Sequence, residues 1–215
     1  DTGSTDDTRE RIRRRFEAAN IPGRVVEHPF VSFGHNRSFA IRAAHDLADY
    51  LLLVDADMKL VIDSSFDAAA LTADVYTKHQ GNAHFSYKNV RLLRTTIGAT
   101  CIGSTHEYYG YPSTCTVGHL DTLRIDDIGD GGCKQNKFER DIRLLNADIA
   151  VDPRNERAHF YIANSYKDTR QWENAITHYQ KRIDLGGWHE EIWYSYYAMG
   201  KCYLEQKQPS RAIHT

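Results

Sequence analysis

One stretch constrains the fold of this chain more than any other: residues 50–54 are an unbroken aromatic and apolar run, followed by Asp55 and Asp57. Such a run predicts a strand buried on both faces, as in a parallel α/β sheet. Alternation along a strand puts Asp55 and Asp57 on the same side. Because ligands of α/β sheets bind beyond the carboxyl ends of strands, two carboxylates there suit Mg²⁺ or Mn²⁺ carrying a phosphate. The alternative is that both acids only start a turn or cap a helix.

The segments before this stretch alternate between helical and extended patterns. Ser4 or Thr5 can cap a helix that runs to about Asn20, where a basic cluster around residues 11–15 reads as a solvated face, and residues 24–28 then read as a strand. The core face of a second helix is expected to consist of Phe39, Ala40, Ala43, Ala44 and Leu47. This order predicts an α/β fold with a mostly parallel sheet and helices on its faces.

The segments after the two acids divide the chain into two domains. A helix is expected over residues 66–79, and the strand-like segments that follow are 83–87, 89–94 and 123–125. From Phe138 the pattern is helical throughout. We therefore predict an α/β domain over residues 1–134 and an all-α domain over residues 135–215.

The helical part contains an internal repetition. Ala163, Tyr166 and Ala175 are followed, at a constant offset of 37 residues, by Gly200, Tyr203 and Ala212. Small and aromatic residues at these separations are typical of tetratricopeptide-like helical hairpins, whose period is about 34 residues. The additional length is expected in residues 186–188. The alternative is an ordinary helical hairpin.

Composition excludes several classes of protein. The net charge of −2 gives no general field for nucleic-acid binding, and no apolar run approaches the length of a membrane span. The four cysteines are scattered without a C-x-x-C pair, which disfavours a zinc site and predicts reduced thiols in the cytoplasm. Asp1 lies in what reads as a loop after a strand, and Thr215 lies within a helix. We therefore expect a piece of a longer protein that lacks its first strand.

Several short segments, in this order, resemble one known family. They are Asp1-Thr2-Gly3-Ser4-Thr5-Asp6, Asp55-Ala56-Asp57, Thr105-His106-Glu107-Tyr108-Tyr109, Gly129-Asp130-Gly131-Gly132, Lys137-Phe138-Glu139-Arg140-Asp141 and Gly186-Gly187-Trp188-His189-Glu190-Glu191. The chain resembles family 2 glycosyltransferases of the GT-A fold, and in particular the bacterial subgroup in which that domain is fused to tetratricopeptide repeats. Some members of this subgroup glycosylate cysteine in bacteriocin peptides.

The resemblance implies a hexosyltransferase-type enzyme that inverts the anomeric carbon of a nucleotide-sugar, usually a UDP-sugar, with Mn²⁺ or Mg²⁺. By this resemblance Asp1 contacts the uracil or ribose, and Asn36 and Arg37 lie near the donor. Asp55 faces the ribose or the metal, and Asp57 binds the metal that bridges the diphosphate. The acceptor is expected to be a peptide or a glycan.

Inverting transfer also needs a base that takes a proton from the acceptor. Glu107 is the first candidate, and Asp130, flanked by glycines, is the second. His106 is a candidate metal or diphosphate ligand. The alternatives are a buried hydrogen-bonded network around His106 and Glu107, and a plain turn at Asp130.

Two further interpretations belong to other classes. The helical repeats can act as a non-catalytic scaffold that binds protein on a concave surface. The aromatic residues that would serve such binding, or form the core between helices instead, are Tyr161, Trp172, Trp188, Trp193, Tyr194 and Tyr197. A D-x-D phosphatase of the haloacid dehalogenase type is disfavoured, because Lys59 stands where that class has Thr or Val.

Overall fold

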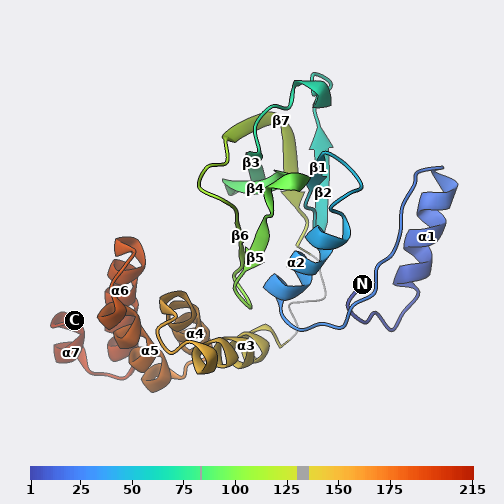
Figure 1. Cartoon of the computed structure of the whole chain (residues 1–215). Coiled ribbons are helices and arrows are strands. Elements are labelled where there is room, and N and C mark those ends of the chain that lie inside the picture. The colour runs from blue at the N-terminus through green and yellow to red at the C-terminus, as the bar shows by residue number, and fades with distance from the viewer. Residues whose placement is uncertain (83, 130–135) are drawn as a thin grey trace. The chain divides into compact units, whose positions relative to one another are not determined.

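The computed structural model describes residues 1–82, 84–129 and 136–215. It is a mixed α/β structure that divides into two compact units (Figure 1). One unit is Asp1–Ile102 with Glu107–Gly132, and the other is Gly103–His106 with Cys133–Thr215. The predicted domain boundary after residue 134 falls outside the described residues.

The first unit is built on a five-stranded sheet with the strand order β1-β4-β3-β7-β2. Its strands are β1 (Tyr50–Leu52), β2 (Met58–Ile62), β3 (Val75–Gly81), β4 (Ser86–Arg94) and β7 (Val117–Asp127). A separate two-stranded sheet pairs β5 (Thr100–Ile102) with β6 (Tyr108–Gly110). The helical elements are α1 (Thr8–Ala18), α2 (Phe33–Ala43) and the short 3₁₀ turns η1 (Ala68–Ala70) and η2 (Thr95–Ile97).

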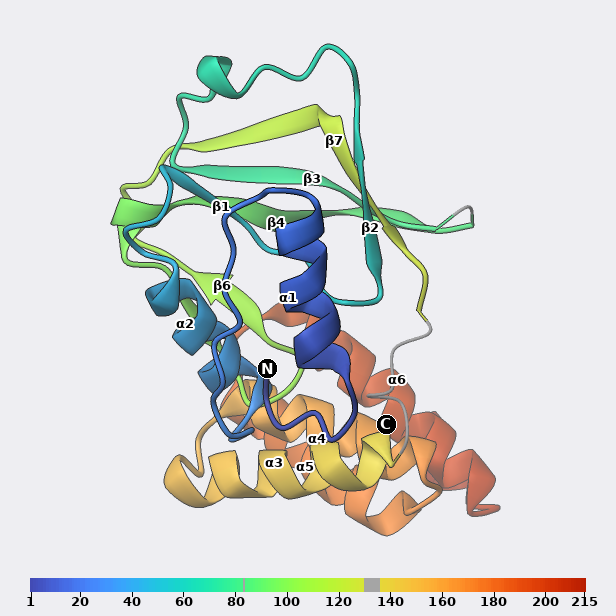
Figure 2. The same cartoon turned by 90° about the vertical axis from the view of Figure 1, so that its right-hand side faces the viewer.

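The predicted mostly parallel sheet is wrong for the described strands. The pairs β1–β4, β3–β4 and β2–β7 are antiparallel, and only β3–β7 is parallel. Figure 2 shows β3 lying between β4 and β7. The turn between β3 and β4 is closed by a hydrogen bond from Asn82 N to Phe85 O, and so short a connection permits only antiparallel pairing.

The central apolar run forms an edge strand instead of a strand buried on both faces. Among the described strands β1 pairs only with β4, and all three of its residues are partly buried. Leu51 and Leu53 pack against the core of Ile41, Val75 and Leu93. The run is therefore apolar because one of its faces meets this core.

Three other local predictions need correction. Residues 66–79 do not form a helix: after η1 they enter β3, where Val75 and Tyr76 have the branched and aromatic side chains that favour strands. Residues 24–28 are not a strand, although Asp1 N donates to Val26 O and His28 N donates to Asp1 O. Of the segments 83–87 and 89–94, residues 86–87 and 89–94 belong to one strand, β4, and 123–125 lies within β7.

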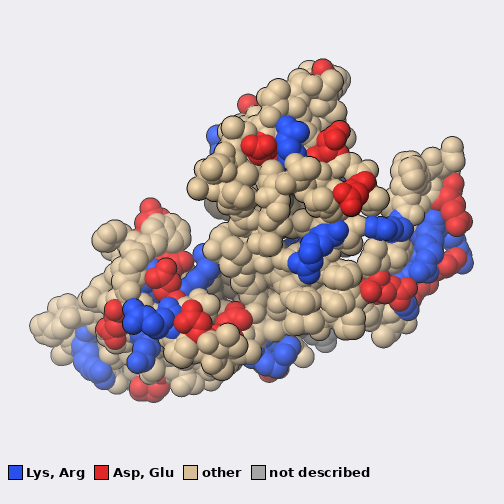
Figure 3. Space-filling model, viewed as in Figure 1, with Lys and Arg blue, Asp and Glu red and all other residues tan. Residues whose placement is uncertain are grey.

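The first two predicted helices form as α1 and α2, but α2 buries a different face from the one predicted. Its N-cap is Ser32, whose Oγ accepts from His35 N at 3.2 Å, and its buried residues are Gly34, Ser38 and Ile41. Leu47, predicted for the core, is 64% exposed. α1 has no buried residue and carries side chains of both charges, as Figure 3 shows on its right. The basic cluster on α1 is thus a solvated face.

The second unit is helical in all its described elements from Lys137 on, as predicted. Its helices are α3 (Lys137–Val151), α4 (Glu156–Asp168), α5 (Trp172–Leu185), α6 (His189–Glu205) and α7 (Pro209–Ile213). Ala163, Ala175, Tyr179, Ala198 and Cys202 are fully buried where α4, α5 and α6 pack together. None of the described helices is long and apolar enough to cross a membrane.

The additional length of the repeat lies in a helix instead of in residues 186–188. α6 has 17 residues and α4, the corresponding helix, has 13. The longer α6 therefore accounts for an offset of 37 residues in place of about 34. Residues 186–188 are held by Arg182, which is fully buried. It donates to the backbone oxygens of Gly186 and Trp188, and its Nε donates to Glu191 Oε2 at 2.9 Å.

Candidate functional site

Asp55 and Asp57 lie in a turn between β1 and β2. Met58 N donates to Asp55 O at 3.1 Å, which makes Asp55 and Asp57 the first and third residues of a four-residue turn. The alternation argument therefore does not apply to them, because the strand has already ended. Both acids are only partly buried and so remain available to a ligand.

Two arginines from distant segments converge on Asp55. Arg37, on α2, donates from Nη1 to Asp55 Oδ1, and Arg91, on β4, donates from Nη1 to Asp55 Oδ2 at 3.3 Å. Arg91 is the extra residue at a register shift between β3 and β4, a feature that re-aims a side chain. Each carboxylate oxygen of Asp55 thus has a cationic partner.

Arg37 also brings Glu107 into this cluster. Its Nε donates to Glu107 Oε1 at 2.7 Å, while Nη1 is bound to Asp55. α2 is fixed next to β5 by Ser38, whose Oγ donates to Cys101 O at 3.1 Å and accepts from Cys101 N at 2.8 Å. Because Glu107 directly precedes β6, the partner of β5, this tether holds Arg37 and Glu107 together.

The charges in this cluster stabilise one another. Burial alone would raise the pKa of the Asp55 carboxyl, but the hydrogen bonds and charges of Arg37 and Arg91 outweigh it and lower that pKa. Burial alone would likewise lower the pKa of Arg37, whereas Asp55 above all, and Glu107, raise it. At neutral pH Asp55 is therefore an anion held between two cations.

A cavity of about 270 Å³ opens beside these residues. Its lining includes Arg37, Asn89, Arg91, Glu107, Tyr108 and Tyr109. Guanidinium groups bind phosphate through paired N–H donors, and a carboxylate in the same cavity can accept a proton. The cavity thus combines anion-binding groups with a candidate base.

The polar network continues across the sheet from Arg91. Gln80 Oε1 accepts from Arg91 Nε at 2.9 Å, and Gln80 Nε2 donates to Asp127 Oδ1 at 3.0 Å. Lys78, on the same face of β3, is fully buried, and its ammonium has no hydrogen-bond partner in the described part of the chain. Burial, and then the charge of Arg91, lower the pKa of Lys78 to about 8, against the opposing charge of Asp127.

Asp57 differs from Asp55 in having no such partner. Within residues 1–82, 84–129 and 136–215, its carboxylate makes no hydrogen bond or ion pair. A divalent cation prefers such an oxygen ligand, whereas the two guanidinium groups on Asp55 oppose a further cation there. The residues therefore fit a Mg²⁺ or Mn²⁺ ion held mainly by Asp57, with Asp55 orienting the arginines.

The other predicted site residues have different surroundings. The carboxylate of Asp1 accepts from Gly3 N and Ser4 N, both at 3.0 Å, and so closes its own loop. Asn36 binds the backbone of residues 29–32, accepting from Val31 N at 2.9 Å. These bonds make Asp1 and Asn36 supports of the N-terminal segment.

His106 falls in the other unit from Asp55 and Asp57, and Asp130 lies outside the described residues. His106 belongs to the helical unit, where its ring stacks on Tyr161 at 4.1 Å and its Nε2 lies 3.9 Å from Asp141 Oδ2. Of the residues predicted from the sequence, Arg37, Asp55 and Glu107 are thus the ones that meet.

The structure also forms a cluster that the sequence pattern does not predict. His79, His119 and Asp121 lie together on β3 and β7, with ligand atoms within 4.8 Å of one another. No H-x-x-x-H spacing marks them, because their proximity comes from strand pairing.

No protein-family model and no curated protein sequence matches this chain.

Proposed function

We propose that this chain is an inverting, metal-dependent glycosyltransferase that moves a sugar from a nucleoside diphosphate, most simply UDP, to a peptide or glycan in the cytoplasm. The observation that carries the proposal is the double role of Arg37, which binds Asp55 and Glu107 beside one cavity. The residues come from three distant segments. The resemblance to family 2 glycosyltransferases implies Arg37 and Asp55 near the donor, and the need for a base singled out Glu107.

The roles divide according to the partners of each side chain. Asp57 would hold the divalent cation, which when bound supplies charge neutralisation for the leaving diphosphate. Arg37 and Arg91 bind the diphosphate oxygens from the cavity wall. Asp55 keeps both guanidinium groups in place and faces the ribose.

Glu107 accepts the proton of the acceptor group. Its Oε1 is fixed by Arg37, and among the described residues Oε2 has no hydrogen-bond partner. A carboxylate oriented in this way can receive a proton from a hydroxyl or thiol that attacks the anomeric carbon. Inversion follows because the acceptor attacks opposite to the leaving diphosphate.

The experiment is UDP release from a panel of UDP-sugars, with and without Mn²⁺. We expect release that depends on Mn²⁺ and falls at least about 100-fold in Glu107→Gln, the usual scale for loss of a general base. Asp46→Asn, at an exposed acid outside the cavity, should stay within about twofold of wild type. Unchanged activity in Glu107→Gln would contradict the assigned role.

A second candidate function, protein binding, is favoured by the surface of α6. Trp193 and Tyr197 are 66% and 51% exposed and stack at 5.7 Å. They adjoin a groove of about 620 Å³ whose lining includes Phe160, Tyr161, Trp188, Trp193 and Tyr194. We assign α4–α7 to the tetratricopeptide type and this groove to an extended acceptor peptide.

This assignment is tested with unstructured peptides that contain cysteine or serine. The Trp193→Ala/Tyr197→Ala variant should bind them less tightly while Mn²⁺-dependent UDP release persists. Peptide binding without any UDP release in wild type would favour a scaffold instead of an enzyme.

A further inference from the structure

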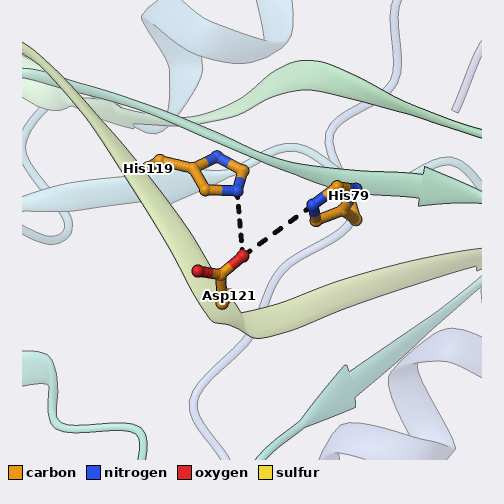
Figure 4. A group of neighbouring side chains, drawn as sticks. All are labelled: His79, His119 and Asp121. Atoms are coloured by element: carbon orange, nitrogen blue, oxygen red, sulfur yellow. Dashed lines mark hydrogen bonds and ion pairs between the residues drawn. The ribbon is translucent and has the colours of Figure 1, made fainter.

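We propose that His79, His119 and Asp121 form a binding site for one transition-metal ion, Zn²⁺ by preference, on the sheet. Figure 4 shows the three side chains pointing toward one another. Asp121 Oδ1 lies 3.0 Å from His119 Nε2 and 3.8 Å from His79 Nε2. Ligands around a tetrahedral Zn²⁺ lie about 3.3 Å apart, given bonds of about 2.0–2.2 Å, so small side-chain rotations suffice.

The fold makes this cluster through one irregularity in the sheet. Thr77 pairs with His119 in the parallel β3–β7 ladder, and His79 is two residues further along β3, on the same face. The register then jumps, so that His79 pairs with Arg124. Asp121 lies in the bulge that this jump creates, and bulges redirect side chains in this way.

A second observation concerns the tautomer of His119. The Thr77 hydroxyl donates to Gly118 O at 3.3 Å and lies 2.9 Å from His119 Nδ1. A hydroxyl whose proton is used in this way can accept the Nδ1–H of His119, and in that tautomer the lone pair of Nε2 faces Asp121. A cation bound between Nε2 and Asp121 Oδ1, which lie 3.0 Å apart, would select this tautomer, and the contact with Thr77 is the kind that orients histidine ligands in metal sites.

The ligand types select the ion. Two imidazoles and one carboxylate suit Zn²⁺ and disfavour Mg²⁺ or Ca²⁺, which prefer oxygen ligands. Three protein ligands leave a coordination position open to water, and Asp121 is 80% exposed. Bound Zn²⁺ would cross-link β3 to the bulge of β7.

This site is independent of the proposed transferase site. Side chains alternate along β3, so Thr77 and His79 lie on the face opposite to Lys78 and Gln80. Gln80 belongs to the network of Arg91 and Asp127, and the histidines do not. Loss of one site therefore leaves the other intact.

The test is calorimetric titration of the whole chain with ZnCl₂, supported by the visible absorption of bound Co²⁺. We expect one ion per chain with tetrahedral Co²⁺ bands, and at least a tenfold weaker affinity in Asp121→Asn and His119→Ala. Thr77→Val keeps all three ligands and should weaken binding about tenfold through the lost outer contact. His84→Ala, at an exposed histidine outside the cluster, should bind as wild type does.

Circular dichroism checks that each variant is folded, and the exposed Asp121 makes Asp121→Asn the variant least disturbing to the fold. Undiminished Zn²⁺ binding by a His79→Ala/His119→Ala variant would overturn the proposal. So would the lack of Zn²⁺ binding by wild type. UDP release by Asp121→Asn should equal that of wild type.

Discussion

Arg170 and Lys207, which lie 37 residues apart, share a left-handed backbone conformation, with φ of 60° and 58°. The next residues, Gln171 and Gln208, each donate from N to the oxygen of the residue five before, Tyr166 or Tyr203, at 2.8 Å. The turn after α4 thus recurs after α6 with the same bonds. The repetition visible in the sequence is therefore a repetition of backbone geometry.

The left-handed conformation of Arg170 and Lys207 predicts how glycine at these positions changes the stability of the helical unit. Left-handed backbone is costly for residues with a Cβ, so Arg170→Gly and Lys207→Gly should each raise the free energy of unfolding by about 0.5–1 kcal/mol. Urea denaturation followed by circular dichroism measures the change. Lys181→Gly, at an exposed position within α5, should instead lower it by about 1 kcal/mol. Equal signs for all three would contradict the shared turn.

A second prediction concerns acid. Burial, followed by the charges of His159 and Lys181, lowers the pKa of His178 from 6.5 to about 4. Between these values the unfolded chain binds more protons at this residue than the folded chain does. The free energy of unfolding is therefore unaffected by His178 above pH 6.5, and it decreases as pH falls from 6.5 toward 4. We expect the helical unit to lose about 1–3 kcal/mol over this range.

The comparison for that prediction is His178→Asn. His159 Nε2 donates to Pro153 O, so its Nδ1 accepts from His178 Nδ1 at 3.0 Å, and an asparagine N–H can replace that donor without titrating. The variant should show a smaller loss of stability between pH 6.5 and 4. Identical pH profiles would mean that His178 is charged in the folded chain.

A third prediction concerns alkali. The pKa of Lys78 is lowered from 10.5 to about 8, so between these values the unfolded chain binds more protons than the folded chain. This group should therefore make the first unit more stable as pH rises from about 8 to 10.5. Lys78→Met should remove that slope and stabilise the unit at pH 7 by about 1–3 kcal/mol, measured by urea denaturation. Destabilisation at pH 7 would mean that the ammonium has a favourable partner.

How far the sequence predicts the structure depends on the range of the interactions. The helices from Lys137 on follow local periodicity, and so does their repetition. The sequence predicts a helix where β3 begins because Ala68, Ala69 and Ala70 favour helix locally, while pairing with β4 and β7 decides the outcome. Propensity cannot reveal that pairing.

Some residues of the candidate site can be predicted from the sequence, and others depend on how the strands pair. Asp55 and Asp57 are conspicuous in the sequence, and the resemblance to a family drew attention to Arg37 and Glu107. Arg91 was missed, because only the register shift in β4 turns it toward Asp55. The cluster that includes His79 was missed for a similar reason, since its geometry depends on a bulge.

The central claim is that Asp57 and its surroundings bind a nucleoside diphosphate through a divalent cation. Calorimetric titration of the chain with UDP, with and without Mn²⁺, tests this most directly in wild type, Asp57→Ala and Glu107→Gln. The account predicts that UDP binds wild type and Glu107→Gln only when Mn²⁺ is present, and does not bind Asp57→Ala. Binding of UDP to Asp57→Ala as tight as to wild type, or no binding to wild type in saturating Mn²⁺, would contradict it.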